Sequence, residues 1–167
     1  MITQKYLNKK GLLRRGYSLR SDGILYKKSV LEKYYDEGYL NLPESPFSDE
    51  DRFRAGQRIA FDYYMANKQG VKSAMCHETN IATTGSVGID VELYYKERYL
   101  RAIKSVPEEF WGVVRSVCIE DKELKVSDKY PIGTLLNKNN KYHQKMLLCL
   151  GLERLAKFYL QKNKKSS

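Results

Sequence analysis

The chain has 167 residues, a hydrophobic share of 42% and a mean hydropathy of −0.60. This length suffices for one compact domain with a core of its own. No apolar run approaches the roughly 20 residues that a membrane-spanning helix needs, and the first residues lack the apolar core of a signal peptide. These features exclude an integral membrane protein, and we expect a cytoplasmic protein.

The formal net charge is +10, and the positive charge gathers at both ends of the chain. Residues 1–35 carry nine Lys and Arg against two acidic residues, a net charge of +7. Residues 137–167 carry eight against one, again +7, whereas the middle, 36–136, carries −4. Segregated positive charge gains affinity for phosphate backbones because counterions are released on binding. The charge pattern therefore favours a nucleic acid as partner. The same charge could attract a membrane surface, but no segment combines a basic face with a large exposed apolar face.

The N-terminal part is predicted to be separate from the rest. Residues 1–23 are basic and rich in Gly, Lys and Arg, which is typical of a partly ordered arm. Apolar spacing over 26–39 predicts a short helix. Two prolines in 42–47 indicate a linker. We expect 1–47 to form a basic N-terminal arm with a short helix, and 48–167 to form a helical domain.

The helical domain is predicted to begin with a helix that is capped by Ser48. Three acidic residues follow, in the first turn where the helix dipole favours negative charge, and Asp51 can complete a capping box with Ser48. The apolar positions indicate that this helix reaches about Asn67. Residues 69–88 have no sustained period and are rich in Gly, Ser and Thr, so they are predicted to form a loop.

Three more helices are predicted before the C-terminal segment. The first covers 90–105, with inward side chains at Leu93, Tyr99, Leu100 and Ile103. Pro107 fits the first turn of the second. Its apolar residues follow a tight helical stripe, formed by Phe110, Val113, Val114, Val117 and Cys118. Residues 126–136 are predicted to form a third, short helix.

The most informative segment is the long amphipathic helix predicted over 142–162. Its apolar side is marked by residues at spacings of four, three and four, namely Leu148, Leu152, Leu155 and Tyr159. Its start is basic and amide-rich, and a loop is predicted before it over 137–141. An apolar back with such a leading turn is typical of a recognition helix in a DNA groove. By itself the pattern is more common in solvated surface helices, and the basic context favours DNA.

The order of elements resembles the helix-turn-helix of sigma-factor region four. The segments RFRAGQRIAFDYY, VPEEFWGVVRSVCIEDKEL and KMLLCLGLERLAKFY are similar to an uncharacterised domain family of bacteria and phages, found mostly in alphaproteobacteria. The resemblance covers roughly residues 52–160. It is carried by Ala55, Gly56, Arg58 and Asp62, by Gly112, Val113, Val114, Val117 and Cys118, and by Lys145, Leu148, Leu150, Leu152, Arg154, Leu155, Ala156 and Tyr159. It implies a helix-turn-helix fold and DNA binding.

We therefore predict a mainly α-helical protein with a helix-turn-helix at about 107–160 and a long final helix. The predicted function is DNA binding, in the regulation of transcription of a bacterium, a mobile element or a phage, with double-stranded DNA as partner. Two alternatives stay open: a phage DNA-packaging component like a small terminase, and a factor that binds host RNA polymerase or another host protein. A homo-oligomer also stays open.

The residues predicted to contact DNA are chosen by their side-chain chemistry. Asn and Gln match adenine edges, and Lys matches guanine or phosphate, so the groove-facing set is Asn139, Asn140, Lys141, His143, Gln144 and Lys145. Phosphate contacts are assigned to Lys138, Arg154 and Lys157 near the C-terminus, and to Lys9, Lys10, Arg14 and Arg15 in the arm.

The sequence gives weaker support for other kinds of functional site. Cys76-His77-Glu78 is a sequence-adjacent cluster, whereas catalytic Cys and His usually meet through the fold. Two histidines and three cysteines without metal-ligand spacing predict no metal site. Residues 83–88 resemble a phosphate-binding loop but lack its closing Gly-Lys-Ser/Thr. Paired tyrosines can stack on single-stranded bases, although core packing is the favoured role. We expect no enzymatic activity and no cofactor.

Overall fold

The computed structural model describes four parts of the chain: residues 11–12, 15–67, 85–124 and 135–161. At the helix ends it describes only the backbone of 85–89, 135–141 and 161.

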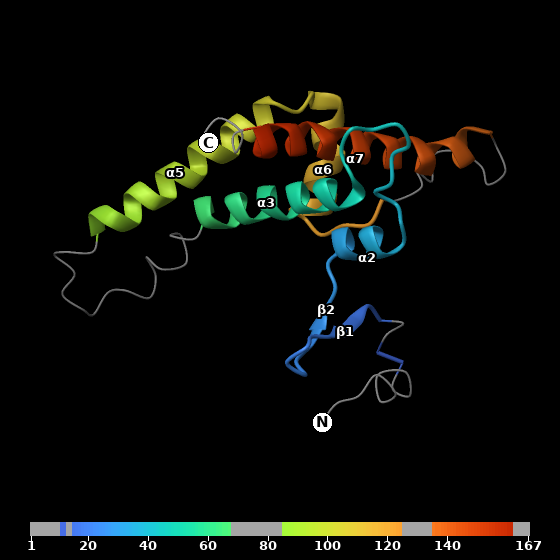
Figure 1. The fold of residues 1–167 in the computed structure, drawn as a ribbon, viewed down its shortest axis with the longest axis horizontal. Coiled ribbons are helices and arrows are strands. Elements are labelled where there is room, and N and C mark those ends of the chain that lie inside the picture. The colour runs from blue at the N-terminus through green and yellow to red at the C-terminus, as the bar shows by residue number, and fades with distance from the viewer. Residues whose placement is uncertain (1–10, 13–14, 68–84, 125–134, 162–167) are drawn as a thin grey trace.

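Within these parts the chain forms two short strands and five helices: β1 Tyr17–Leu19, β2 Leu25–Lys27, α2 Val30–Asp36, α3 Asp49–Asn67, α5 Gly85–Lys104, α6 Glu108–Cys118 and α7 Leu135–Gln161. The predicted mainly helical class with a long final helix is confirmed. Helix α3 packs against the four other helices, and the strands lie at the α2 side of the helical body (Figure 1).

The two strands form an antiparallel hairpin in which Ser18 is paired with Tyr26. Its turn contains Gly23 at φ +82°, a backbone conformation that residues with a Cβ rarely adopt. Residues 17–19 of the arm predicted over 1–23 therefore form a β-strand. Residues 1–10 lie outside the described part of the chain.

Helix α2 begins at Val30, later than the helix predicted over 26–39. The hydroxyl of Ser29 accepts a hydrogen bond from the Glu32 backbone N–H at 3.2 Å, and the Glu32 carboxylate accepts one from the Ser29 N–H at 2.8 Å. This capping box sets the start of the helix. The Val30 N–H donates to the Asp121 carboxylate at 2.7 Å, which joins α2 to the segment after α6.

Helix α3 begins and ends where the sequence predicted. The Ser48 hydroxyl accepts a hydrogen bond from the Asp51 N–H at 3.1 Å, and the Asp51 carboxylate accepts one from the Ser48 N–H at 3.0 Å. The helix ends at Asn67. The predicted capping box is confirmed.

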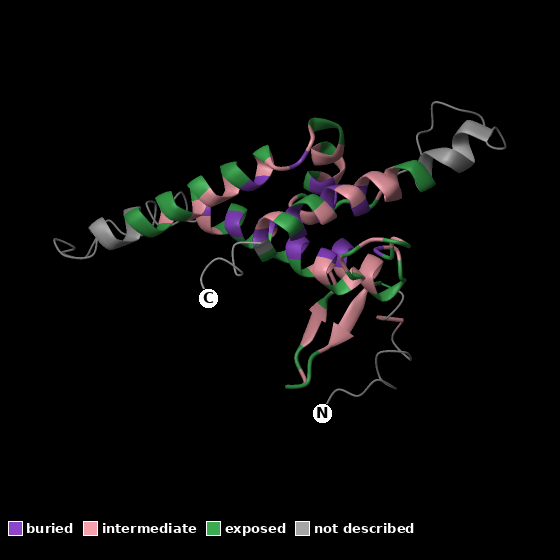
Figure 2. Cartoon of the chain, turned by 45° about the horizontal axis from the view of Figure 1, so that its top comes forward, coloured by how far each residue is buried: buried purple, intermediate pink, exposed green. Residues whose placement is uncertain are grey.

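The core lies where α3, α6 and α7 meet, shown by the buried positions in Figure 2. The predicted apolar stripe of the final helix is confirmed, since Leu148, Leu152 and Leu155 are fully buried. The stripe predicted for α6 also faces this core: Val114 and Val117 are buried, with Phe110, Val113 and Cys118 packed at the edge.

Two side chains of α5 that were predicted to face inward do not do so. Leu93 and Leu100 are 51% and 47% exposed, so the prediction that they face the core was wrong. The buried side of α5 is instead marked by Ala102, which is fully buried, while Tyr99 and Ile103 are half-buried. Hydrophobic spacing identified the helix correctly but placed two of its four inward side chains wrongly, because apolar residues occur around most of its circumference.

The start of α5 also differs from the prediction. The helix begins at Gly85, so the last residues of the loop predicted over 69–88 are helical. Residues 69–84 lie outside the described part of the chain.

The start of α7 differs most. The loop predicted over 137–141 is helical, because α7 begins at Leu135. No proline or glycine lies between Gly133 and Gly151. Each Asn costs only about 0.7 kcal/mol relative to Ala within a helix, and each added residue extends the hydrogen-bonded ladder.

This geometry leaves the helix-turn-helix predicted at 107–160 unconfirmed. The turn expected before the final helix is part of α7, and so are the last two residues of the short helix predicted over 126–136. The remaining residues of that short helix lie outside the described part of the chain.

Candidate nucleic-acid interface

Helix α7 is held against α6 through Gly151. A Cβ atom on Gly151 would lie 2.4 Å from Cγ2 of Val114 and 3.2 Å from Cβ of Phe110. The first separation is too short for two carbon atoms that are not bonded to each other. Only glycine at position 151 therefore allows the helices to approach this closely. This contact fixes which side of α7 faces the body.

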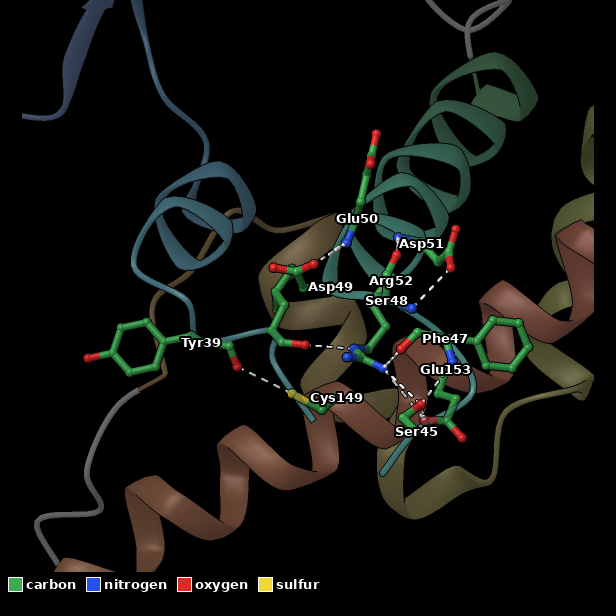
Figure 3. A network of polar contacts seen from close by, with 11 residues as sticks. Tyr39, Ser45, Phe47, Ser48, Asp49, Glu50, Asp51, Arg52, Cys149 and Glu153 are labelled. Carbon is green, nitrogen blue, oxygen red and sulfur yellow. Dashed lines mark hydrogen bonds and ion pairs between the residues drawn. The ribbon is translucent and has the colours of Figure 1, made fainter. Parts of the chain in front are cut away.

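A buried arginine holds α7 from the α3 side (Figure 3). Arg52 is 1% exposed, and its Nε donates to the Leu40 carbonyl at 2.6 Å. Its Nη1 donates to the Ser45 hydroxyl at 3.0 Å and to the Phe47 carbonyl at 2.9 Å, and lies 3.7 Å from the Glu153 carboxylate. The buried charge is thus both hydrogen-bonded and paired, as a buried charge must be.

This network pairs the negative charge of α7 with Arg52. Glu153 is the only acidic residue in the sequence of α7, and it also accepts a 2.6 Å hydrogen bond from Ser45. The exposed side keeps three basic residues, His143, Arg154 and Lys157. At 3.6 residues per turn these three lie within about 60° of one another around the helix. Among the described residues, none of the three has a carboxylate partner.

The structure separates two predicted groove residues from that exposed side. Gln144 and Lys145 are half-buried. The Lys145 ammonium lies 4.7 Å from the centroid of the Tyr39 ring, a cation–π contact that directs it toward the segment between α2 and α3. Lys145 therefore does not share the outer side of α7 with His143.

The other predicted contact residues are placed only in part. Four of them lie in the first turns of α7, where the backbone alone is described: Lys138, Asn139, Asn140 and Lys141. Arg15 is exposed just before β1. The arm residues Lys9, Lys10 and Arg14 lie outside the described part of the chain.

Sequence analysis missed a cluster of aromatic and charged side chains around Tyr159 of α7. The Tyr159 hydroxyl donates to the buried Asp62 carboxylate at 2.8 Å. Arg98 of α5 donates to both oxygens of that carboxylate, with its Nε 2.8 Å from Oδ2. The Arg58 guanidinium lies 5.5 Å from the centroid of the Tyr159 ring. Three helices therefore converge on one phenol.

The environment of this cluster keeps Tyr159 and Arg98 in fixed protonation states. Burial raises the pKa of Tyr159 far above its ordinary value, and the hydrogen bond to Asp62 adds to the rise. The hydrogen bonds to Asp62 are the main cause that raises the pKa of Arg98. A neutral phenol and a charged guanidinium thus persist across the physiological pH range. Arg58 adds an exposed positive charge beside them.

Aromatic rings extend the cluster along α3 and α5. Arg98 lies 5.3 Å from the ring centroid of Tyr94 and 5.1 Å from that of Tyr95. Phe61 packs edge to face with Tyr95, their centroids 5.6 Å apart. Phe61 and Tyr94 are 49% and 52% exposed, so large parts of both rings face solvent.

A hollow of about 180 Å³ lies next to the cluster, between α3 and α7. Its lining includes Arg54, Arg58, Tyr159 and Leu160. Leu160 is three residues after Lys157, so the two are neighbours on the helix surface and the hollow borders the exposed basic side of α7. The two arginines come from successive turns of α3.

Within the described residues, no group of His, Cys, Asp and Glu side chains can hold a metal ion. Cys76-His77-Glu78 lies outside that part of the chain. Residues 83–84 also lie outside it, and residues 85–88 form the start of α5. Burial raises the pKa of Cys118 to about 12, so its thiol stays protonated at neutral pH.

No protein-family model matches the chain, and comparisons with curated proteins and with solved structures find no match. None of the helices in the described ranges has the length and apolar character to cross a membrane. The chemistry of the α7 surface and of the Tyr159 cluster is therefore the basis for a functional proposal.

Proposed function

We propose that this protein binds double-stranded DNA through the exposed side of α7. The observation that carries the proposal is the withdrawal of Glu153 toward the buried Arg52. His143, Arg154 and Lys157 then face solvent without a carboxylate partner among the described residues. Arg154 and Lys157 are cations at neutral pH, and unopposed cations on one helix side gain affinity for phosphates by counterion release.

The dimensions of α7 suit this role. Its 27 residues span about 40 Å, slightly more than one turn of duplex DNA. The helix extends past α6 and α3 at its N-terminal end (Figure 1). A projecting helix can enter the major groove, which admits an α-helix, while Arg154 and Lys157 contact phosphates nearer the body. Regulation of transcription is the process we propose for this binding.

The test compares two double variants by fluorescence anisotropy on a short labelled duplex over a salt series. Arg154→Gln with Lys157→Gln removes two cations from α7, whereas Lys96→Gln with Lys104→Gln removes two exposed cations from α5. If both α7 residues neutralise phosphates, the log–log salt slope falls by about 1.8, because each neutralised phosphate accounts for about 0.9 of it. The α5 variant should keep the parent slope.

Equal reductions of affinity in the two variants would show a non-localised charge effect and contradict the proposal. Unchanged duplex affinity of the α7 variant would contradict it as well.

A further inference from the structure

We propose that the cluster around Tyr159 forms a second binding surface, formed by other residues beside the exposed basic side of α7, which takes single-stranded nucleic acid. In this arrangement unpaired bases stack on Phe61 and Tyr94, and the adjoining phosphates bind Arg54 and Arg58. The proposal rests on the Arg–aromatic geometry of α3, α5 and α7, and not on the duplex contact proposed above.

The stacking part follows from two exposed rings that are held by their neighbours. Phe61 contacts Tyr95 at an interplanar angle of 83°, and Tyr94 contacts the same Tyr95 ring at 78°. The Tyr94 hydroxyl also accepts a 3.1 Å hydrogen bond from Arg98. Because these contacts restrict both rings before binding, a base that stacks on them loses little additional side-chain entropy. Each base stacked on an aromatic ring contributes to affinity independently of its sequence.

The phosphate part follows from the two arginines that line the hollow. The cation–π contact with Tyr159 positions Arg58 and leaves its N–H groups without a carboxylate partner among the described residues. Arg54 is held by Glu50 at 2.5 Å through one Nη, which leaves its other donors available. A guanidinium offers five N–H donors in a planar fork that matches phosphate oxygens. Asp51 also lines the hollow, and its carboxylate accepts the Ser48 N–H.

The combination of exposed rings and guanidinium donors favours nucleic acid over other partners. The buried Asp62 is already paired with Arg98, so it does not oppose an incoming anion. A net charge of +10 makes two copies of the chain repel each other. Duplex DNA keeps its bases stacked inside, whereas a single strand presents both flat base faces and phosphates to the same surface. Single-stranded nucleic acid therefore matches the rings and the arginines together.

The experiment measures binding of a fluorescein-labelled thymidine oligomer by anisotropy. Phe61→Leu keeps an apolar side chain and removes the aromatic face, whereas Phe61→Tyr keeps that face. We expect Phe61→Leu to weaken binding about fivefold or more, and Phe61→Tyr to stay within about twofold of the parent. Arg58→Gln should lower the log–log salt slope by about 0.7. Thermal denaturation of each variant checks that the fold is retained.

A second measurement locates the contact directly. The same oligomer with 5-iodouracil is photo-cross-linked to the parent protein, and the attached peptide is identified by mass spectrometry. Cross-links within α3 or α5 at Phe61 or Tyr94 support the proposal. Cross-links confined to α7, no binding by the parent, or equal affinity of Phe61→Leu and parent would overturn it.

Two controls separate this proposal from its rivals. The Arg154→Gln and Lys157→Gln double variant should lose duplex affinity and keep thymidine-oligomer affinity, so failure of one proposal leaves the other testable. Sedimentation of the parent and Phe61→Leu tests a second copy as occupant. A parent dimer that Phe61→Leu converts to monomer, with unchanged oligomer affinity, would assign the surface to self-association and overturn the proposal.

Discussion

The hydroxyl of Tyr159 donates a 2.8 Å hydrogen bond to the carboxylate of Asp62, which lies 97 residues earlier in the chain. The bond joins α7 to α3 inside the protein, and Arg98 of α5 binds the same carboxylate. One buried ion pair therefore sets how three helices lie relative to one another. The rings and arginines at the surface of this cluster depend on that arrangement.

Removing the Tyr159 hydroxyl or the Asp62 carboxylate should lower the stability of the fold by different amounts. Tyr159→Phe deletes one hydrogen bond to a charged group and should lower the free energy of unfolding by about 1.5–3 kcal/mol. Asp62→Ala leaves the mostly buried Arg98 guanidinium without its carboxylate and should cost about 3–5 kcal/mol. Urea denaturation at neutral pH measures both. A smaller loss for Asp62→Ala than for Tyr159→Phe would contradict the central position of the carboxylate.

Two glycines provide a matched test of the contact between α6 and α7. Gly151→Ala places a Cβ 2.4 Å from Val114 and should cost about 1–3 kcal/mol, because the helices must move apart. Gly112→Ala on α6 meets no atom within 4 Å and should be neutral or stabilise by up to about 1 kcal/mol, as alanine favours helix. Thermal denaturation compares the two. Equal melting temperatures would show that the helices do not approach through Gly151.

The thiol of Cys118 gives a prediction for alkaline pH. The residue is only half-buried, but its sulfur points inward, 3.1 Å from where a Cβ on Gly56 would lie. Burial raises its pKa from 9.0 to about 12. The folded state therefore keeps a proton that the unfolded chain releases above about pH 9. The resulting stabilisation is complete below pH 9 and is lost as the pH rises toward 12.

This loss should be absent from Cys118→Ala. The difference in the free energy of unfolding between parent and Cys118→Ala should fall by about 1.4 kcal/mol from pH 8 to pH 10. Urea denaturation under reducing conditions at both pH values provides the measurement, and titrating tyrosines cancel in the difference. A constant difference would place the sulfur in contact with solvent.

The basic residues before β1 should affect DNA binding and leave stability unchanged. Truncation through residue 20 would delete β1, so substitution is the cleaner experiment. The variant replaces by Gln the four arm cations that were assigned to phosphate contacts: Lys9, Lys10, Arg14 and Arg15. Its log–log salt slope of duplex binding should be lower by about 0.9 for each phosphate that these cations neutralise in the parent. An unchanged slope with an unchanged melting curve would remove the arm from the interface.

Local signals in the sequence predicted much of the fold. The capping box of Ser48 and Asp51 depends on residues three positions apart, and the buried row from Leu148 to Leu155 depends on one helical period. Both signals are reliable because they depend only on residues that are close together in the sequence. The run of Asn over 137–141 was misleading, because its weak local preference is outweighed once a helix from Leu135 continues through it.

The buried charges could not be predicted in the same way. Arg52 meets Glu153 and Asp62 meets Tyr159, and these partners are about a hundred residues apart in the sequence. One weak signal existed: Arg52, Ala55, Ile59 and Asp62 recur at spacings of three, four and three. Charged residues inside such an apolar row indicate buried partners, although the row does not identify them. The rings of the Tyr159 cluster likewise come from three helices that only the fold brings together.

Helix α7 has two environments along its length, and this affects how the protein can change. From Leu148 onward its turns are fixed by the core, whereas Tyr142 to Leu147 are exposed or half-buried. Exposed substitutions usually change stability by less than about 0.5 kcal/mol. The exposed positions of this stretch, Tyr142 and His143, can therefore acquire new side chains one at a time without compensating changes elsewhere. Surface chemistry can diverge at these positions, while the turns from Leu148 onward keep the fold constant.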